Sequence, residues 1–217
     1  TFDTFDRVYV SFSAGKDSSV MLHLVEDEAR RRGRRFGLLL VDLEGQYHVT
    51  IEYARQRFAD LADITDQYWV CLPLILRNAV SVYEPRWTCW DPEQQAAWIR
   101  QPPPGAVTDA RYFDWFVPGM EFEEFVPAFG EWYADGTETA CLVGIRANES
   151  LNRFRTIAST SKVTKDGRQE STQVSDHVYT SIPYTTGPPR TSGPTTARTP
   201  TGPTTGSTTS WAWPDSA

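Results

Sequence analysis

The sequence has little cysteine, little methionine and no long apolar run. Cys71, Cys89 and Cys141 are widely spaced and form no Cys-x-x-Cys pair, which argues against a zinc site or an iron–sulfur cluster built from them. An odd number of scattered cysteines is typical of reduced thiols, so we expect a cytoplasmic protein. No apolar stretch approaches the roughly 20 residues that a membrane-spanning helix needs, and we expect no membrane association.

Positive charge is also scarce. The 217 residues carry 21 Lys and Arg against 28 Asp and Glu, a formal net charge of −7, which argues against direct, non-specific binding to nucleic acid. The first six residues, Thr-Phe-Asp-Thr-Phe-Asp, are acidic and do not resemble a signal peptide. Hydrophobic residues make up 40% of the chain and charged residues 23%, proportions that predict one soluble domain, or one domain with a tail.

The most informative stretch is residues 8–25. Val8, Tyr9, Val10 and Phe12 are β-branched or aromatic and predict a buried strand. The apolar spacing from Ser19 onward predicts a helix. Between them, residues 13–18 form a small polar turn. A strand, a glycine-containing turn and a helix in that order make an anion site, because free N–H groups and the helix dipole point at the ligand.

The residue types in the turn suit a phosphate ligand. Gly15 permits close approach of the backbone, Lys16 adds a mobile cation, and Ser13 and Ser18 add hydroxyl donors. Asp17 is explained as a helix N-cap or as a magnesium ligand. The spacing is not that of a Walker A loop. The alternative is a helix cap without a ligand.

The segment Ser-Ala-Gly-Lys-Asp-Ser at 13–18 resembles the Ser-Gly-Gly-x-Asp-Ser loop of the PP-loop ATP pyrophosphatases and phosphoadenosine phosphosulfate (PAPS) reductases. The departure is Ala14 where the family usually has Gly, which is tolerable at negative φ and unfavourable at positive φ. The resemblance implies ATP or PAPS as the nucleotide, with Mg²⁺ at Asp17, and a place in sulfur metabolism as a transferase. It implies nucleotide contacts by Ser11, Ser13, Ala14, Gly15, Lys16, Asp17 and Ser18.

The remaining pattern predicts an α/β fold. Residues 36–43, 68–72 and 139–145 read as buried strands and residues 49–61 as an amphipathic helix. The repeated strand–helix–strand order predicts a doubly wound, mostly parallel sheet with flanking helices, and the resemblance makes that fold adenine nucleotide alpha-hydrolase-like. Asp42 stands at the end of the second strand, where ligands sit in such sheets; the alternative for this residue is a loop cap.

Several other segments have two interpretations. Arg77 and Arg86 are candidates for a phosphate or sulfate clamp, and Trp87 and Trp90 either flank a base or pack on the core. The arginine run 30–35 is either a polyanion patch or a solvated helix end matched to the dipole, and we favour the second. The pair Asp91-Pro92 predicts the start of a helix over 93–100. We expect residues 105–120 to form an insertion packed on the core. The helix at 121–133 is expected to be a face for a protein partner or a lid.

A second anion site is predicted after the strand at 139–145. Arg146 and Arg153 could face one oxyanion, with Glu149 holding one of them; the alternative is an ordinary surface pair. PAPS reductase-like proteins carry a similar Gly-x-Arg-x-x-Glu-Ser pattern. The longer pattern, over roughly residues 8–179, resembles the predicted PAPS sulfurtransferase subfamily. The candidate catalytic cations are Lys16, Arg146 and Arg153.

The composition changes near residue 182. We predict a nucleotide-binding domain over 1–181 and a disordered tail rich in Thr, Pro and Gly over 182–217. Read one base out of frame with plausible codons, residues 182–196 decode as YPIYDWATEDIWTDN, which resembles the Asp-Trp-x-x-x-Asp-Ile-Trp segment of PAPS reductase-like proteins. We therefore hypothesise a frameshift near residues 179–182, which sequencing of the gene tests.

The sequence thus predicts an adenine-nucleotide enzyme acting at the phosphate or phosphosulfate of ATP or PAPS, by sulfur-group transfer or adenylylation. None of the three cysteines has the Glu-Cys-Gly setting of the PAPS reductase catalytic thiol. The alternatives are a non-catalytic nucleotide-binding regulator or partner protein, and a truncated, inactive member of the family.

Overall fold

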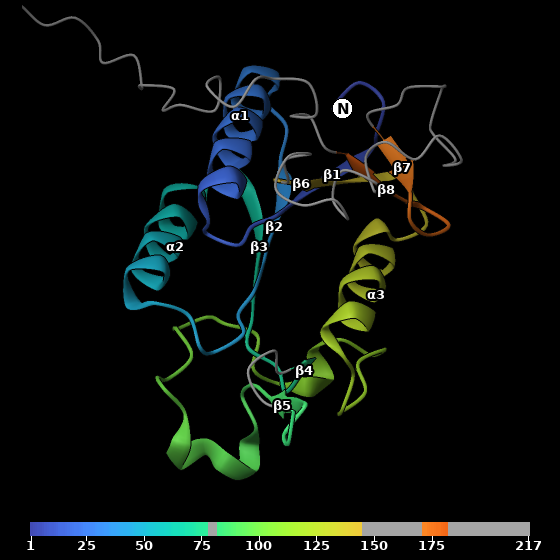
Figure 1. Ribbon diagram of the computed structural model, residues 1–217. Helices are drawn as coiled ribbons and strands as arrows, with labels where there is room; N and C mark the ends of the chain where they lie inside the picture. Colours follow the sequence, from blue (N-terminus) through green and yellow to red (C-terminus); the bar gives the residue numbers. More distant parts are fainter. Residues whose placement is uncertain (78–81, 145–170, 182–217) are drawn as a thin grey trace, which may run out of the picture.

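A computed structural model describes residues 1–77, 82–144 and 171–181. They form a six-stranded sheet of order β3-β2-β1-β6-β8-β7 and a two-stranded hairpin of β4 and β5 (Figure 1). In the sheet, β1, β2, β3, β6 and β8 run parallel, and β7 is an antiparallel edge strand. The strands are β1 Arg7–Ser11, β2 Phe36–Val41, β3 Thr65–Val70, β4 Ile75–Arg77, β5 Arg86–Thr88, β6 Thr139–Val143, β7 Ser171–Gln173 and β8 Val178–Ser181. The mostly parallel α/β sheet predicted from the sequence is confirmed.

Helices cover both faces of the sheet. The helices are α1 Lys16–Arg32, α2 His48–Asp60 and α3 Phe122–Ala134, with 3₁₀ turns at η1 Pro92–Ala97 and η2 Ala110–Tyr112. In Figure 1, α1 and α2 lie on one side of the sheet and α3 on the other. The central strands are buried on both faces as a result, which explains why β1 and β2 read as continuous apolar runs.

The face under α3 is built from aromatic rings. Tyr9 of β1 lies 5.5 Å from Phe129 and 5.3 Å from Tyr133 between ring centroids. A Cβ at Gly37 would lie 2.8 Å from the Tyr133 ring, so this ring packs directly on the backbone of β2. The aromatic side of α3 is therefore turned toward the sheet and holds the helix on it.

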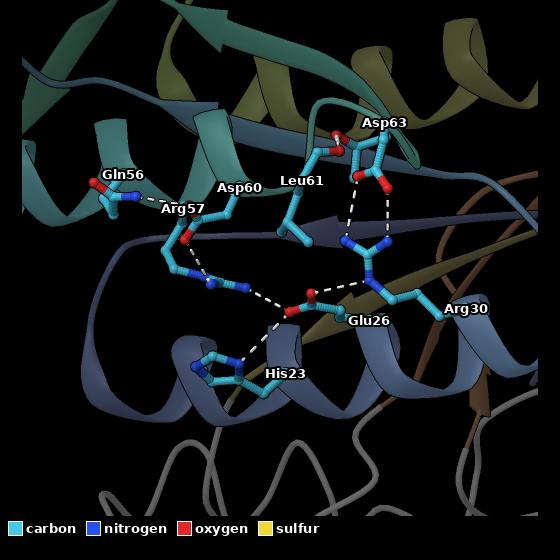
Figure 2. A network of polar contacts seen from close by, with 9 residues as sticks. His23, Glu26, Arg30, Gln56, Arg57, Asp60, Leu61 and Asp63 are labelled. Atoms are coloured by element: carbon cyan, nitrogen blue, oxygen red, sulfur yellow. Dashed lines mark hydrogen bonds and ion pairs between the residues drawn. The ribbon is translucent and has the colours of Figure 1, made fainter. Parts of the chain in front are cut away.

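On the opposite face, ion pairs tie α1 to α2 and to the segment that follows α2. Figure 2 shows Glu26 accepting from both Arg30, at 3.2 Å, and Arg57, at 2.6 Å. Arg57 also donates to Asp60 at 3.0 Å, and Arg30 makes a bidentate pair with Asp63 at 2.6 and 3.2 Å. These contacts fix how the helices pack beside each other.

The arginine run ends α1 as predicted. Gly33 has φ 62 and occupies the left-handed C-cap position. Arg32 pairs with Asp3, Arg34 donates to the carbonyl of Phe2 at 2.6 Å, and Arg35 pairs with Asp66 at 2.9 Å. The run therefore fastens the N-terminal segment and the start of β3, and this supports the helix-end interpretation over the polyanion patch.

Several element boundaries differ from the sequence prediction. The first helix begins at Lys16 rather than Ser19, β2 ends at Val41 rather than residue 43, and β3 begins three residues before Tyr68. The helix expected over 93–100 is a shorter 3₁₀ turn, although Asp91 caps it as predicted by accepting from the N–H of Glu93 at 3.0 Å. In the described ranges, no helix combines the length and apolar character needed to cross a bilayer. The predicted tail at 182–217 lies outside the described residues.

Candidate functional site

The order of the strands defines where a ligand would bind. From β1 the chain proceeds to β2 and β3 on one side and then returns to place β6 on the other side of β1. Ser11, at the end of β1, is in register with Leu39 of β2 and Val143 of β6, so three strands end at one edge. The change of direction between β1 and β6 is a topological switch point, and open α/β sheets bind ligands at the carboxyl ends of the strands there.

The loop at residues 13–18 lies at this switch point. Gly15 is the N-cap of α1, with φ −79 and ψ 168, and Lys16 and Asp17 belong to the first helical turn. The earlier start of the helix matters, because the first turn of an α-helix carries N–H groups without intrahelical acceptors. Lys16 is exposed and Asp17 is partly exposed. A cation and the positive end of a helix therefore meet at the switch point.

Serine hydroxyls hold the loop in shape. The Oγ atoms of Ser13 and Ser18 lie 3.0 Å apart, and the Ser18 hydroxyl donates to the carbonyl of Gly15 at 3.0 Å. Ser19 Oγ donates to the same carbonyl at 2.7 Å. Ser18 is buried, whereas Ser13 and Gly15 are exposed. The buried hydroxyl thus organises the turn, and the exposed residues present it to a ligand.

Ala14 has a left-handed backbone. Its φ is 56°, the case that the sequence marks as unfavourable for a residue other than glycine. An L-residue in this region carries a penalty of about 1–2 kcal/mol. The loop therefore keeps the backbone conformation that glycine would supply, and it does so under strain.

Gly144 brings the end of β6 against the loop. A Cβ at this position would lie 2.6 Å from the N and Cα of Ser18 and 2.7 Å from the carbonyl carbon of Asp17. Only glycine permits so close an approach of two backbones. Residue 144 is the first of the Gly-x-Arg-x-x-Glu-Ser pattern, so the start of this pattern contacts the loop of residues 13–18. Arg146, Glu149 and Arg153 themselves lie outside the described residues.

Asp42 is placed at the predicted edge, but its carboxylate is fully buried and engaged. Its Oδ2 accepts from the indole N–H of Trp69 at 2.8 Å, and its Oδ1 accepts from the N–H of Glu44 at 2.9 Å and pairs with Arg100. This arrangement is closer to the loop-cap alternative than to a direct ligand contact. Asp42 organises the edge of the sheet.

Glu44 performs a similar task. It is buried, and its carboxylate accepts from the N–H of Trp90 at 2.8 Å and from the N–H of Ile99 at 3.1 Å. The indole N–H of Trp90 donates to the carbonyl of Asp42 at 2.6 Å. Two acidic residues after β2 thus hold residues 90–100, which we call the strap, across the carboxyl edge of β2.

The remaining predicted ligand residues are less central. Ser11 is the last residue of β1 and is partly buried. Arg77 is exposed at the end of β4, where it stands opposite Arg86 in the hairpin, and Arg86 pairs with Glu121 at 2.7 Å. The hairpin extends beyond the carboxyl end of β3 (Figure 1), so neither arginine belongs to the loop of residues 13–18. Trp90 is buried and packs on the core, and Trp87 is 38% exposed.

Metal and thiol chemistry have few candidates. Across the part of the chain that the structure describes, no group of three or more His, Cys, Asp or Glu side chains is placed to hold a metal ion. All three cysteines are free and buried. Burial raises the pKa of the Cys89 thiol to about 11 and that of Cys141 to about 12, and it raises the pKa of Cys71 further. Such thiols are poor nucleophiles near neutral pH.

The sequence analysis did not predict three features of this edge: the pairing of Arg100 with Asp42, the hydrogen bonds from backbone N–H groups to Glu44, and the close contact of Gly144 with Ser18. The position of Gly144 at the end of a buried strand was a usable signal, because a glycine there often marks close approach of another backbone. No signal in the sequence predicts the Asp42–Arg100 pair, because the two residues are far apart in the sequence and only the fold brings their segments together.

No family model matches the chain. The chain is 45% identical over 163 residues to the uncharacterized protein YbdN of Escherichia coli (strain K12), and the alignment covers 75% of this chain and 40% of that relative. The chain thus spans less than half the length of this relative. The function is therefore argued from the site.

Proposed function

We propose that the protein binds an adenine nucleotide, ATP or PAPS, with its phosphate or phosphosulfate group on the loop of residues 13–18. One observation carries the proposal: a glycine-capped helix N-terminus with an exposed Lys16 lies at the switch point between β1 and β6. The choice of ATP or PAPS rests on the resemblance of this loop to that of the PP-loop ATP pyrophosphatases and PAPS reductases.

The chemistry proposed is group transfer at the phosphate or phosphosulfate. Lys16 and the first-turn N–H groups of α1 stabilise negative charge on the transferred group. With ATP, attack at the α-phosphate releases pyrophosphate. Arg146 and Arg153 are the proposed additional cations, with Glu149 as the residue that holds one of them.

Magnesium fits the proposal as a companion of ATP. The partly exposed Asp17 lies in the first turn of α1, beside the proposed phosphates. Mg²⁺ in nucleotide sites typically takes one or two carboxylates together with phosphate oxygens and water. Asp17 would hold the ion, which supplies charge neutralisation of the phosphates.

The burial of the cysteines favours a second candidate function. With PAPS, reduction or sulfur transfer needs a reactive thiol, and the three thiols of this chain are buried with raised pKa values. The thiol would have to come from outside these residues. A non-catalytic nucleotide-binding regulator or partner protein uses the same loop without that requirement.

Calorimetric titration tests the nucleotide. ATP–Mg and PAPS are titrated in parallel into the chain, a Lys16→Ala variant and an Arg111→Ala control. Arg111 is exposed and pairs with its neighbour Asp109 at 2.9 Å, so its loss removes a surface cation without touching the loop. We expect one nucleotide to bind the chain and the control equally, and the Lys16→Ala variant at least about tenfold more weakly, as for loss of one charge-assisted contact.

The outcomes separate the candidates. Binding of ATP with pyrophosphate release supports the enzyme, and binding of either nucleotide without turnover supports the regulator. Equal binding by the Lys16→Ala variant contradicts a role of the loop, and no binding by the folded chain contradicts both candidates.

A further inference from the structure

Arg100 is a buried arginine whose hydrogen-bonding capacity is only partly used. Its side chain is 17% exposed and pairs through Nη2 with Asp42, which is fully buried. The guanidinium stacks over the ring of Trp90, 5.0 Å from the centroid. Nε and Nη1 are both buried, and neither has a hydrogen-bond partner among the residues that the structure describes. Two buried N–H donors without acceptors are costly and call for an explanation.

Arg57 provides a comparison within the same chain. Its Nε is also buried without a partner in the described ranges, but its other two nitrogens bind the carboxylates of Glu26 and Asp60. It lies in the layer of helices α1 and α2, where it completes the network of Figure 2. Arg57 is thus neutralised by two acids, whereas Arg100 offers two unused donors and meets one carboxylate at one nitrogen.

The surroundings of Arg100 are strained as well as buried. Glu44 and Trp90 have φ values of 64° and 52°, in the left-handed region, and they are joined by the hydrogen bond from the Trp90 N–H. Such strained residues gather at ligand clamps and active sites, where the surrounding structure holds them in place. Arg100 belongs to this cluster, at the carboxyl edge of β2, one strand away from the loop of residues 13–18.

We propose that Arg100 is an anion-binding residue of the candidate site. Its Nε–H donates to an oxygen of a tetrahedral oxyanion, a phosphate or sulfate group, while Asp42 retains Nη2 and sets the orientation of the guanidinium. Because Nε and Nη1 are both buried, binding of the oxyanion requires the side chains around Arg100 to move. The identity of the oxyanion as part of the bound nucleotide rests on the proposed function, but the anion site itself does not.

Proton–nitrogen NMR of arginine side chains tests the proposal on the full chain. The Nε–H signal of Arg100 is assigned by its loss in Arg100→Lys, a variant that keeps a cation for Asp42. The signal of Arg57, assigned with Arg57→Lys, is the internal control. Sodium phosphate, sodium sulfate, ATP–Mg and PAPS are titrated separately, against sodium chloride of matched ionic strength.

We expect the Arg100 signal to shift saturably with phosphate or sulfate and with the nucleotide, while the Arg57 signal stays in place. By calorimetry, Arg100→Lys should bind the nucleotide about tenfold more weakly, the effect of losing one charge-assisted hydrogen bond. A circular dichroism spectrum checks that the variant is folded. The NMR titration of the unaltered chain tests the proposal even if the variant does not fold.

The two proposals fail in different ways. An Arg100 signal that ignores every oxyanion, or that moves with sodium chloride or together with Arg57, overturns the anion site even if nucleotide binds. A response to phosphate or sulfate by a chain that binds no nucleotide supports the anion site and contradicts the proposed function.

Discussion

At the scale of single residues, strain and close contact gather at one edge of the sheet. Ala14, Glu44 and Trp90 have left-handed backbones, and Gly144 touches the backbone of Ser18. The other left-handed residue that is not glycine in the described ranges, Asp135, merely caps α3. Strain of this kind persists where the surroundings hold it, which is typical of sites that bind ligands.

Replacement of Ala14 by glycine should relieve part of that strain. We expect Ala14→Gly to raise the free energy of unfolding by about 1 kcal/mol, because glycine adopts φ 56 without steric conflict. Urea denaturation measures the change. The control is Ala59→Gly, on the exposed side of α2, which should instead lower stability by about 1 kcal/mol. Destabilisation by both changes would contradict the strained loop.

Replacement of Gly144 by alanine should damage the loop. The added Cβ meets backbone atoms of Ser18 at 2.6 Å, and backbone cannot give way as a flexible side chain can. We expect Gly144→Ala to cost about 1–3 kcal/mol of stability and to abolish measurable nucleotide binding. Gly45→Ala is the matched control, because its Cβ would meet nothing closer than 3.9 Å. Equal behaviour of the two variants in calorimetry and urea denaturation would argue against the close contact.

At the scale of elements, α3 shows how the role of a helix face depends on the sheet against which the helix packs. Its acidic and aromatic residues predict a face for a partner or a lid, but the sequence alone does not show which side of the helix meets the sheet. In the structure Phe125 and Phe129 are fully buried, and Tyr133 packs on Gly37. The amphipathic pattern was visible, but the surface against which it packs depends on the sheet order.

Truncation of Phe129 should therefore act on stability. We expect Phe129→Ala to lower the free energy of unfolding by about 3–5 kcal/mol, because the ring is fully buried among the rings of Tyr9, Tyr68 and Phe113. Tyr112→Ala, at a ring that is 51% exposed, should cost clearly less. Thermal unfolding compares the two variants, and a smaller loss for Phe129→Ala would contradict the packing of α3 on the sheet.

At the scale of the whole molecule, the sequence predicted the class of fold better than it predicted the short strands at the edge of the sheet. The buried strands β1, β2, β3 and β6 were visible as apolar runs, and the strand–helix–strand order gave a parallel sheet. The short strands β7 and β8 were not recognised, because three or four polar and β-branched residues leave no periodic pattern. The loop of residues 13–18 was found from local chemistry, whereas the cluster around Arg100 depends on contacts between distant segments.

Stability should fall at both ends of the pH range. Hydrogen bonds from Arg31 and Arg32 lower the pKa of Glu28 to about 2, so this contribution is present above the ordinary value of 4.5 and is lost as the pH falls toward 2. Burial raises the pKa of Cys89 to about 11 and of Cys141 to about 12, so stability is full below pH 9, the ordinary thiol value, and is lost as the pH rises toward 12.

Urea midpoints across this range check the profile. The variant Cys89→Ser/Cys141→Ser should lose part of the decline above pH 9, and Glu28→Gln part of the decline below pH 4.5. A variant whose profile keeps the shape of the unaltered chain at the corresponding end would contradict the assignment.

The loop of residues 13–18 is the proposed binding site for a nucleotide phosphate. The most direct measurement is amide hydrogen exchange, by mass spectrometry, of the full chain with and without saturating ATP–Mg or PAPS. The loop and the first turn of α1 should exchange more slowly with one nucleotide, α2 should be unchanged, and the Lys16→Ala variant should lose the protection. Nucleotide binding that leaves exchange in residues 13–19 unchanged would contradict the claim and place the site elsewhere.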